Sequence, residues 1–550
     1  MMKVANRAEQ RGRRVPPTVA GFEAALRDYG YDGVAEALIS RHNQRIERVV
    51  DVGHMMQCIG LPLLASYLPL GLAAEELGAH PARPPFYSGP NWPDHLAWGL
   101  DSVAAAVRLI MSLQPVGASI IARTQLERWS SNLQFNSGID QQPGESTSAW
   151  LSRLWSPPPV RPPDGVVTPV GDLFAEISEL LHGRGPLMPL VWLDIADVTD
   201  VPSNDHIRLL ETISDALVVS LSHIRTGLTT AAEAKGWHAR AQMINMVRLV
   251  SPARGWLPDL RAFLLPLVPH VFGQSGVEGW LGAMACEHRR VISALRAGQR
   301  SDQPAAIWPV LSFGAQRFRA RTQAEISRRW ERELLGDRFE ENSVDNLATE
   351  AVLAGEMAAM LALWLRQDPV KRSAADAFAV CASGLRSAQW LWLEDDSRGM
   401  GCLRCVIEQV ARARTWRLRP ERAAKIEGSP KSTPRDWMEG AGWRRLNLLN
   451  RALGEFAHGS TRTNWNLARE ALVELQDHAG SDEAKYTGRT HALAAMIFIV
   501  SVECAAWVDS LSKKLGEAYR RVIRVDDARA DRAIEALMNR AWEKRGTPLR

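Results

Sequence analysis

The chain carries one short pattern twice, and this recurrence limits its fold more than any other feature of the sequence. The stretch NRALGEFAHGSTRT contains Glu455 and His458, followed by a glycine. The stretch DLFAEISELLHGRG contains Glu179 and His182 at the same spacing, again followed by a glycine. Residues three apart on an α-helix are neighbours on one face, and a glycine commonly follows the last helical residue. Both stretches are therefore predicted to be helices that end at a histidine.

Each copy of this pattern follows a helical stretch in which an arginine and a glutamate stand four residues apart. The pair is Arg123 and Glu127 in the first half of the chain, and Arg404 and Glu408 in the second half. In both halves an apolar helical stretch precedes the pair, a loop rich in proline and serine separates it from the histidine, and a long apolar stretch follows. The arginine and the histidine are 59 residues apart in the first half and 54 in the second, a difference that the loop can absorb. This shared order indicates an internal duplication.

The spacing of apolar residues favours helices throughout the chain. Stretches such as HLAWGLDSVAAAVRLIMSL repeat apolar residues with the 3.6-residue period of a buried helix, whereas the alternation typical of strands is scarce. We therefore expect an all-α fold of tandem, internally duplicated four-helix up-and-down bundles, with an extra helical segment between them. The expected boundaries are 1–17 for a flexible basic arm, 18–235 for the N-terminal bundle, 236–343 for a helical connecting region, 344–515 for the C-terminal bundle and 516–550 for a charged helical tail.

The composition is that of an ordinary soluble globular protein, with 46% hydrophobic and 23% charged residues. A net charge of +4 is too small to argue by itself for a nucleic-acid partner. The uncharged stretch from Met55 to Ala74 has the length of a membrane span, but Pro62 and Pro69 interrupt it, so we interpret it as a buried helical hairpin. No apolar segment of the signal-peptide type follows the basic N-terminus. We expect a cytoplasmic protein with no membrane partner.

Several other residue types are expected to serve the core. The tryptophans are scattered through apolar helical patterns, as large core side chains are. Cys402 and Cys405 form a single CxxC without a second pair or a histidine cluster, which favours reduced thiols on a buried helix over a zinc site. Asp194, in the sequence LDIAD, is interpreted as a surface carboxylate. The sequence lacks the phosphate-loop, dinucleotide-binding, zinc-protease and serine-hydrolase motifs.

The arginine–glutamate pairs have a structural interpretation. Arginine and glutamate four residues apart lie one turn apart on the same helix face and can form an ion pair. The residues around both pairs are apolar, such as Ile121 in the first half and Val406 in the second. A partly desolvated charged pair needs a partner across the bundle, because a lone buried charge is costly. The histidine of the same half is the natural partner, and such a network would fix the helices in a non-catalytic scaffold or interaction protein.

A second interpretation rests on a resemblance. Arg451, six intervening residues and His458 resemble the Arg-x(4–6)-His signature of the HEPN superfamily (higher eukaryotes and prokaryotes nucleotide-binding). An Arg-x-x-x-Glu helix followed by a late His-Gly is also similar to uncharacterised bacterial helical families allied to it. The resemblance covers about residues 374–515, with a fainter echo over 95–235. It implies a helical bundle that cleaves or binds RNA in a bacterial toxin-type or defence system, since many HEPN proteins are metal-independent ribonucleases of such systems.

The resemblance also implies roles for residues of the second half. His458 would act as general acid and base on the ribose 2′-hydroxyl and the leaving oxygen, and Arg451 would hold the scissile phosphate. Glu408 or Glu455 would orient the histidine, and Arg404 completes the set. The expected partners are RNA and a second copy of the chain, because HEPN ribonucleases act as dimers. No cofactor and no metal is expected, and the sequence names no protein partner.

The first half departs from the family pattern. Its equivalent residues are Arg123, Glu127, Glu179 and His182. The position that matches Arg451 falls near Phe174 or Ala175, so this copy has no second arginine. It would therefore be non-catalytic under the same mechanism.

A third interpretation is a di-iron carboxylate bundle, which takes single glutamates from two helices and Glu-x-x-His from two others. The chain offers that inventory in Glu127, Glu408, Glu179 with His182, and Glu455 with His458. Two features argue against it. An arginine one turn from each lone glutamate would repel a metal cation, and each histidine stands at a predicted helix end, whereas such ligands project from the middle of a helix.

Overall fold

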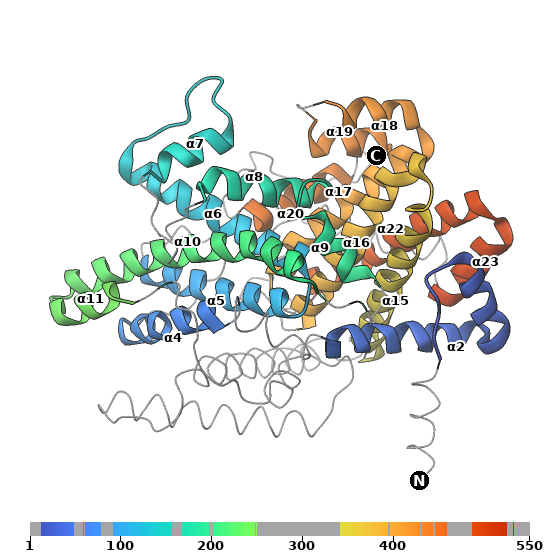
Figure 1. Cartoon of the computed structure of the whole chain (residues 1–550), viewed down its shortest axis with the longest axis horizontal. Helices are drawn as coiled ribbons and strands as arrows, with labels where there is room; N and C mark the ends of the chain where they lie inside the picture. Colours follow the sequence, from blue (N-terminus) through green and yellow to red (C-terminus); the bar gives the residue numbers. More distant parts are fainter. Residues whose placement is uncertain are drawn as a thin grey trace, which may run out of the picture.

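The computed structural model of the chain consists of α-helices joined by turns and short loops (Figure 1). It describes residues 13–48, 59, 61–78, 92–156, 168–196, 200, 202–247, 249, 341–393, 396–429, 432–443, 446–458, 487–524 and 532. Within these ranges there is no β-strand. The predicted all-α class is therefore confirmed.

The described helices of the first half include α10, the longest, against which most of the others pack. They are α2 (Val19–Arg48), α4 (Leu61–Glu76), α5 (Trp92–Met111), α6 (Pro115–Ser137), α7 (Thr147–Leu154), α8 (Val170–Leu181), α9 (Met188–Ile195), α10 (Asn204–Ala234) and α11 (His238–Asn245). The element α2 consists of two helical segments joined by a kink at Gly30, where the backbone angles are not helical. That glycine has a φ of 68°, which few other residues adopt.

The helices of the second half include one short 3₁₀ turn, η5 (Pro369–Lys371). They are α15 (Glu341–Leu365), α16 (Arg372–Leu393), α17 (Arg398–Leu418), α18 (Pro420–Glu427), α19 (Pro434–Gly440), α20 (Leu446–His458), α22 (Thr487–Leu511) and α23 (Lys513–Ile523).

Helix ends follow local sequence signals. Pro115 opens α6. At this position the backbone N–H that proline lacks would have no partner within the helix. Ser203 begins α10 with a capping box. Gly138 follows α6 and Gly183 follows α8, with φ values of 67° and 70° that favour glycine. The predicted end of α8 at the His-Gly pair is thus confirmed.

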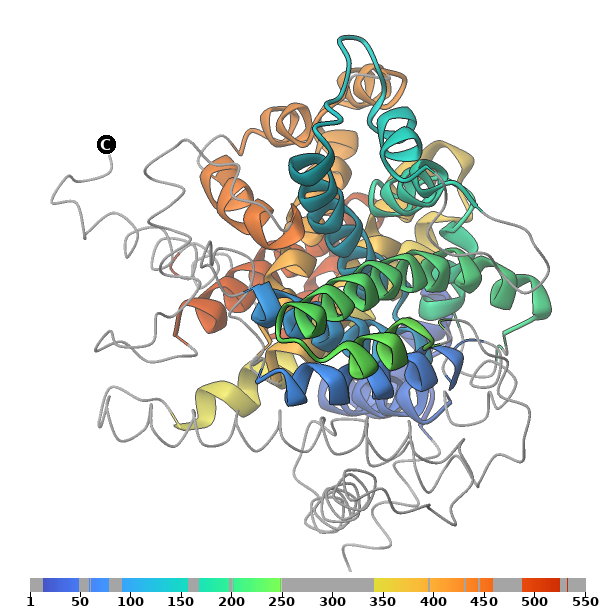
Figure 2. The same cartoon turned by 90° about the vertical axis from the view of Figure 1, so that its left-hand side faces the viewer.

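The order of helices in the first half recurs in the second. A long apolar helix (α5, α16), the helix with the arginine–glutamate pair (α6, α17), the helix that ends at the histidine (α8, α20) and a long closing helix (α10, α22) follow one another in both. The two sets share their packing, since α6 lies against α16, α17 and α20, and one hydrophobic core runs through both (Figures 1 and 2). The order agrees with the predicted duplication, which stays a prediction.

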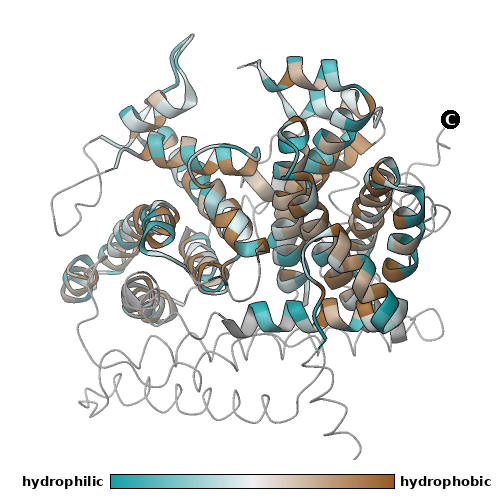
Figure 3. Cartoon of the chain, turned by 45° about the vertical axis from the view of Figure 1, so that its right-hand side comes forward, coloured by the Kyte–Doolittle hydropathy of each residue, from teal (hydrophilic) through white to brown (hydrophobic). Residues whose placement is uncertain are grey.

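Large apolar side chains fill this core, and the helices turn their hydrophobic faces toward one another (Figure 3). Trp129 and Trp392 are each 1% exposed, which confirms the core role predicted for such tryptophans. Apolar stretches of α15 and α22, Leu347–Leu365 and Arg489–Leu511, have the length and hydropathy to cross a membrane. However, 83% and 78% of their most apolar windows are buried inside the fold, as is typical of core helices.

A break divides the last helical stretch of the second half. The predicted helix that continues to Leu515 is two helices, because α22 ends at Leu511 and α23 begins at Lys513. Ser512 separates them with an extended backbone, and its hydroxyl accepts a hydrogen bond from the Leu515 N–H as an N-cap. Most of the expected connecting region and charged tail lies outside the described residues, so the boundaries proposed for them stay predictions.

Candidate functional site

Two sets of side chains carry the predicted chemistry. The first-half motif comprises Arg123, Glu127, Glu179 and His182. The second-half motif comprises Arg404, Glu408, Arg451, Glu455 and His458. The helices α6 and α8 bear the first motif, and α17 and α20 bear the second. The side chains of Glu455 and His458 lie outside the described part of the chain, whereas their backbone positions on α20 lie within it.

The arginine–glutamate pair of each motif forms the expected ion pair along its helix. Arg123 Nε donates to Glu127 Oε1 at 3.3 Å, and Arg404 Nε donates to Glu408 Oε1 at 2.9 Å. These side chains are only 9–18% exposed. The prediction of paired, partly desolvated charges is therefore confirmed in both halves.

The end of each histidine-bearing helix touches the arginine–glutamate helix of the other half. The Leu181 carbonyl, at the end of α8, accepts a hydrogen bond from Gln409 Nε2 of α17 at 2.9 Å. The Ala457 carbonyl, near the end of α20, accepts one from Thr124 Oγ1 of α6 at 2.7 Å. The two motifs are thus interleaved at the interface between the halves. The sequence predicted partners within each half and gave no sign of this exchange.

His182 lies at the end of α8 among arginines from both halves. Burial, followed by the charges of Arg123, Arg184, Arg404 and Arg412, lowers its pKa from 6.5 to about 3. The imidazole is therefore neutral at physiological pH and is a weak base. Its backbone is also fixed, because the His182 carbonyl accepts a hydrogen bond from Arg412 Nη1 at 3.0 Å.

The other members of the first-half motif point to different neighbours. The Glu179 carboxylate lies against Gly185, in the turn after α8, and not beside Arg123. The Arg123 guanidinium carbon is 5.2 Å from the centre of the Phe174 ring, a cation–π contact. An aromatic ring thus covers Arg123 in the region where the second-half motif has its second arginine.

The second-half motif brings Arg404 onto the face of α20 that carries Arg451 and His458. The Arg404 guanidinium lies over Gly454, and a Cβ at that glycine would be 3.6–3.7 Å from its nearest atoms. Gly454 is three residues after Arg451 and four before His458, so all three share one helix face. Arg451 is partly buried. The structure therefore places the Arg404–Glu408 ion pair against the face of α20 that is predicted to bear the catalytic residues Arg451 and His458.

An open cleft of about 780 Å³ begins at the turn after His182. The α8–α9 turn, α9, α16, α17 and α18 line it, and its charged and aromatic side chains are Arg184, Trp192, Asp200, His206, Arg366, Arg372, Asp376, Arg412 and Glu427. A cleft of this size accommodates a small-molecule ligand. We call it the arginine cleft.

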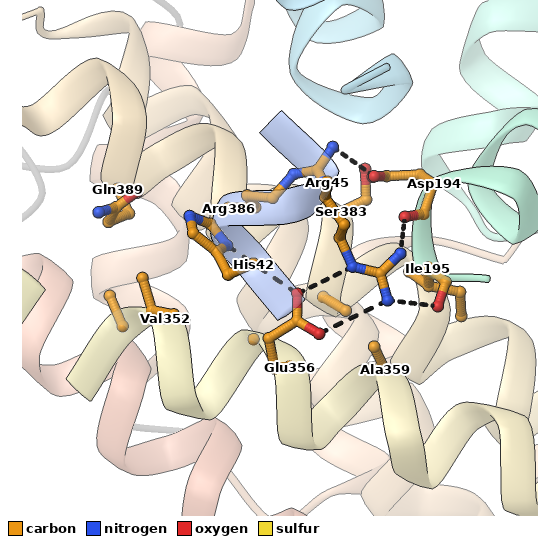
Figure 4. A pocket seen from close by; sticks show the side chains of 13 residues that line it. His42, Arg45, Asp194, Ile195, Val352, Glu356, Ala359, Ser383, Arg386 and Gln389 are labelled. Carbon is orange, nitrogen blue, oxygen red and sulfur yellow. Dashed lines mark hydrogen bonds and ion pairs between the residues drawn. The ribbon is translucent and has the colours of Figure 1, made fainter. Parts of the chain in front are cut away.

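A buried charged cluster lies where α2, α9, α15 and α16 meet (Figure 4). Arg45 Nε donates to Glu356 Oε1 at 3.0 Å, and Arg45 Nη1 donates to the Asp194 carbonyl at 2.6 Å. Arg386 forms an ion pair with the Asp194 carboxylate. Burial opposes ionisation of Glu356, but the charges of Arg45 and Arg41 outweigh it and lower its pKa. The enclosed space is about 10 Å³, the size of one water, so we assign the cluster a structural role.

Sequence reasoning missed this cluster and misplaced one of its members. The interpretation of Asp194 as a surface carboxylate is wrong, because its side chain is 1% exposed and pairs with Arg386. A signal was present in the sequence. Glu356 is the single charged residue of the apolar stretch AVLAGEMAAMLALWL, and a carboxylate in a buried helix needs a cationic partner.

The described side chains do not assemble a metal site. Within the described ranges, no three His, Cys, Asp or Glu side chains lie close enough together to hold an ion. Glu127 and Glu408, the lone glutamates of the di-iron interpretation, are each paired with an arginine instead. Cys402 and Cys405 are free and buried, and burial raises the pKa of both thiols, as predicted for reduced cysteines on a core helix.

Comparison of the chain with protein-family models, with curated proteins and with solved structures finds no match.

Proposed function

We propose that this protein is a cytoplasmic, HEPN-like ribonuclease of a bacterial defence or toxin-type system, with the second-half motif as its active site. The contact between the Arg404 guanidinium and Gly454 is the observation that carries the proposal. It gives one helix face, formed by Arg451, Gly454 and His458, a second arginine and its paired glutamate. These cationic groups suit the cleavage of a phosphodiester, because negative charge develops on the phosphate oxygens in the transition state.

The proposed mechanism needs no metal. His458 takes the proton of the ribose 2′-hydroxyl and returns a proton to the leaving oxygen, while Arg451 and Arg404 neutralise the phosphate. Glu408 holds Arg404 in place through its ion pair, and Glu455 orients the histidine. A homodimer would bring two such faces to one RNA, as the resemblance implies.

A non-catalytic scaffold is the second candidate, and a specific observation favours it for the first half. The neutral His182, the carbonyls held by Gln409 and Arg412, and the Phe174 ring over Arg123 all tie helices together. We assign the first-half motif this structural role of holding helices together, which we call the fastening role, whether or not the second-half motif is catalytic. The two candidates then differ only in what the second-half motif does.

RNA cleavage in the presence of EDTA separates the two candidates. Purified protein is incubated with labelled single-stranded RNA, beside His458→Ala and Arg451→Ala variants and a His238→Ala control at an exposed position on α11. The ribonuclease proposal expects cleavage by the wild type and the control, loss of cleavage in the two variants, and nearly unchanged melting temperatures. Absence of cleavage by the wild type, or cleavage that His458→Ala retains, would leave the scaffold as the function.

A further inference from the structure

The arginine cleft has a rigid aromatic floor. Trp192 of α9 is 7% exposed, and its Nε1 donates to Asp376 Oδ1 at 3.2 Å. Two guanidinium groups lie over this indole, with the Arg366 carbon 4.3 Å and the Arg372 carbon 5.8 Å from the ring centre. The cleft therefore has cationic groups stacked on a buried indole.

Two of the four arginines of the cleft form ion pairs with its carboxylates. Arg412 forms a bidentate pair with Glu427, at 2.9 Å through Nε and 2.5 Å through Nη2. Arg372 Nε lies 3.6 Å from Asp376 Oδ1. These two ion pairs line the wall of the cleft, and Arg184 and Arg366 are its other two arginines.

Arg184 and Arg366 have no ion pair with any carboxylate among the described residues. Both are exposed in the cleft. Burial is the largest cause that lowers the pKa of Arg366; the like charge of Arg372 adds to it, and the charge of Asp376 opposes it. Among the described lining residues four arginines face three carboxylates, those of Asp200, Asp376 and Glu427, so the cleft is net positive. An anion bound beside Arg366 would relieve its repulsion with Arg372.

We propose that the arginine cleft binds a phosphate monoester of about mononucleotide size, with the phosphate on Arg184 and Arg366. A phosphate monoester carries about −1.5 to −2 charges at neutral pH, which suits a cleft whose arginines outnumber its carboxylates, and arginine binds phosphate oxygens in pairs. The carboxylates of Asp376 and Glu427 accept hydrogen bonds from hydroxyl or amino groups on the remainder of the ligand. This site is separate from the second-half motif and does not depend on RNA cleavage.

Calorimetric titration of the full chain with AMP, ribose 5-phosphate, inorganic phosphate and adenosine tests the proposal. We expect AMP or ribose 5-phosphate to bind, and adenosine, which lacks the phosphate, to give no heat. In an Arg184→Ala/Arg366→Ala variant the Kd should rise by about tenfold or more, because two charge-assisted contacts are lost. The control is Arg208→Ala/Arg435→Ala, which removes arginines that are 77% and 66% exposed outside the cleft.

A short RNA with a 5′-phosphate, compared with the same RNA with a 5′-hydroxyl, identifies the source of the phosphate. Preference for the phosphorylated RNA assigns the site to RNA ends, and preference for AMP or ribose 5-phosphate assigns it to a free metabolite. The proposal is overturned if none of the phosphorylated probes binds at millimolar concentration, or if the double variant binds them as the wild type does. Neither result depends on whether His458 is catalytic.

Discussion

The first-half and second-half motifs share an arginine–glutamate pair and a histidine at a helix end, but their surroundings differ. In the first half, Phe174 covers Arg123, and His182 is a neutral ring among four arginines, with its carbonyl held by Arg412. In the second half, Gly454 leaves room for the Arg404 guanidinium on the helix face that bears Arg451. Side chains from both halves cover the first-half motif, whereas the second-half motif has an additional arginine on its helix face. The same residues thus serve as a fastening in one place and, in our proposal, as an active site in the other.

The strongest test of the fastening role is the glycine after His182. A Cβ at Gly183 would overlap Arg412 Nη1 and lie 3.0 Å from Gln409 Oε1, and its φ is +70°. Gly183→Ala should lower the free energy of unfolding by about 3 kcal/mol, through left-handed strain and displacement of Arg412.

The matched control is Gly442→Ala, which has a similar φ of +79° and no neighbour within 4 Å. It should cost only about 1–2 kcal/mol, the strain alone. Urea denaturation measures the free energy of unfolding of both variants. Equal losses would mean that the contact with α17 does not fasten the halves.

The next largest effect is expected from Arg412→Ala. The change removes hydrogen bonds to the His182 and Gly183 carbonyls and leaves Glu427 without its partner. A loss of about 2–3 kcal/mol in the free energy of unfolding is expected, against less than about 0.5 kcal/mol for Arg435→Ala, whose side chain is 66% exposed. A loss no greater than that of the control would contradict the fastening role.

The neutral state of His182 predicts a pH dependence. Its pKa is about 3 in the folded chain against 6.5 ordinarily, so the unfolded chain binds the proton more tightly. Its contribution to stability is complete above pH 6.5 and is lost as the pH falls toward 3. His42 and His223, with pKa values lowered to about 4 by burial, act in the same direction.

Comparison with a His182→Gln variant isolates the share of His182 in this effect. Between pH 6.5 and pH 4.5 the wild type should lose about 1–2 kcal/mol more than the variant, measured by urea denaturation at each pH. Parallel curves for the two proteins would show that His182 is solvated and already titrates near its ordinary pKa.

The smallest effect is expected at Gly454. A Cβ there would make only ordinary contacts with the Arg404 guanidinium, at 3.6 Å or more. Gly454→Ala should raise the free energy of unfolding by about 0.5–1 kcal/mol, because alanine favours the helix interior, and RNA cleavage should persist. Gly454→Leu should instead displace Arg404 and reduce cleavage. Cleavage by the leucine variant at the wild-type rate would remove Arg404 from the proposed site.

Residue spacing was enough to predict much of the fold. The 3.6-residue period predicted the all-α class, and the spacing of Arg404 and Glu408 predicted their ion pair. The exchange of helix ends between the halves could not be predicted, because the bonds of Thr124 and Gln409 go to backbone carbonyls far away in the chain, which leave no pattern in the sequence. The burial of Asp194 was missed for a similar reason, since its partner Arg386 is 192 residues away.

The most direct test of the account is RNA cleavage in EDTA by His458→Ala and His182→Ala, assayed side by side with the unfolding of each variant. We expect His458→Ala to abolish cleavage with nearly unchanged stability. We expect His182→Ala to retain cleavage at neutral pH and to change the stability and its pH dependence. The reverse pattern, in which His182→Ala abolishes cleavage and His458→Ala does not, would contradict the assignment of catalysis to the second half and fastening to the first.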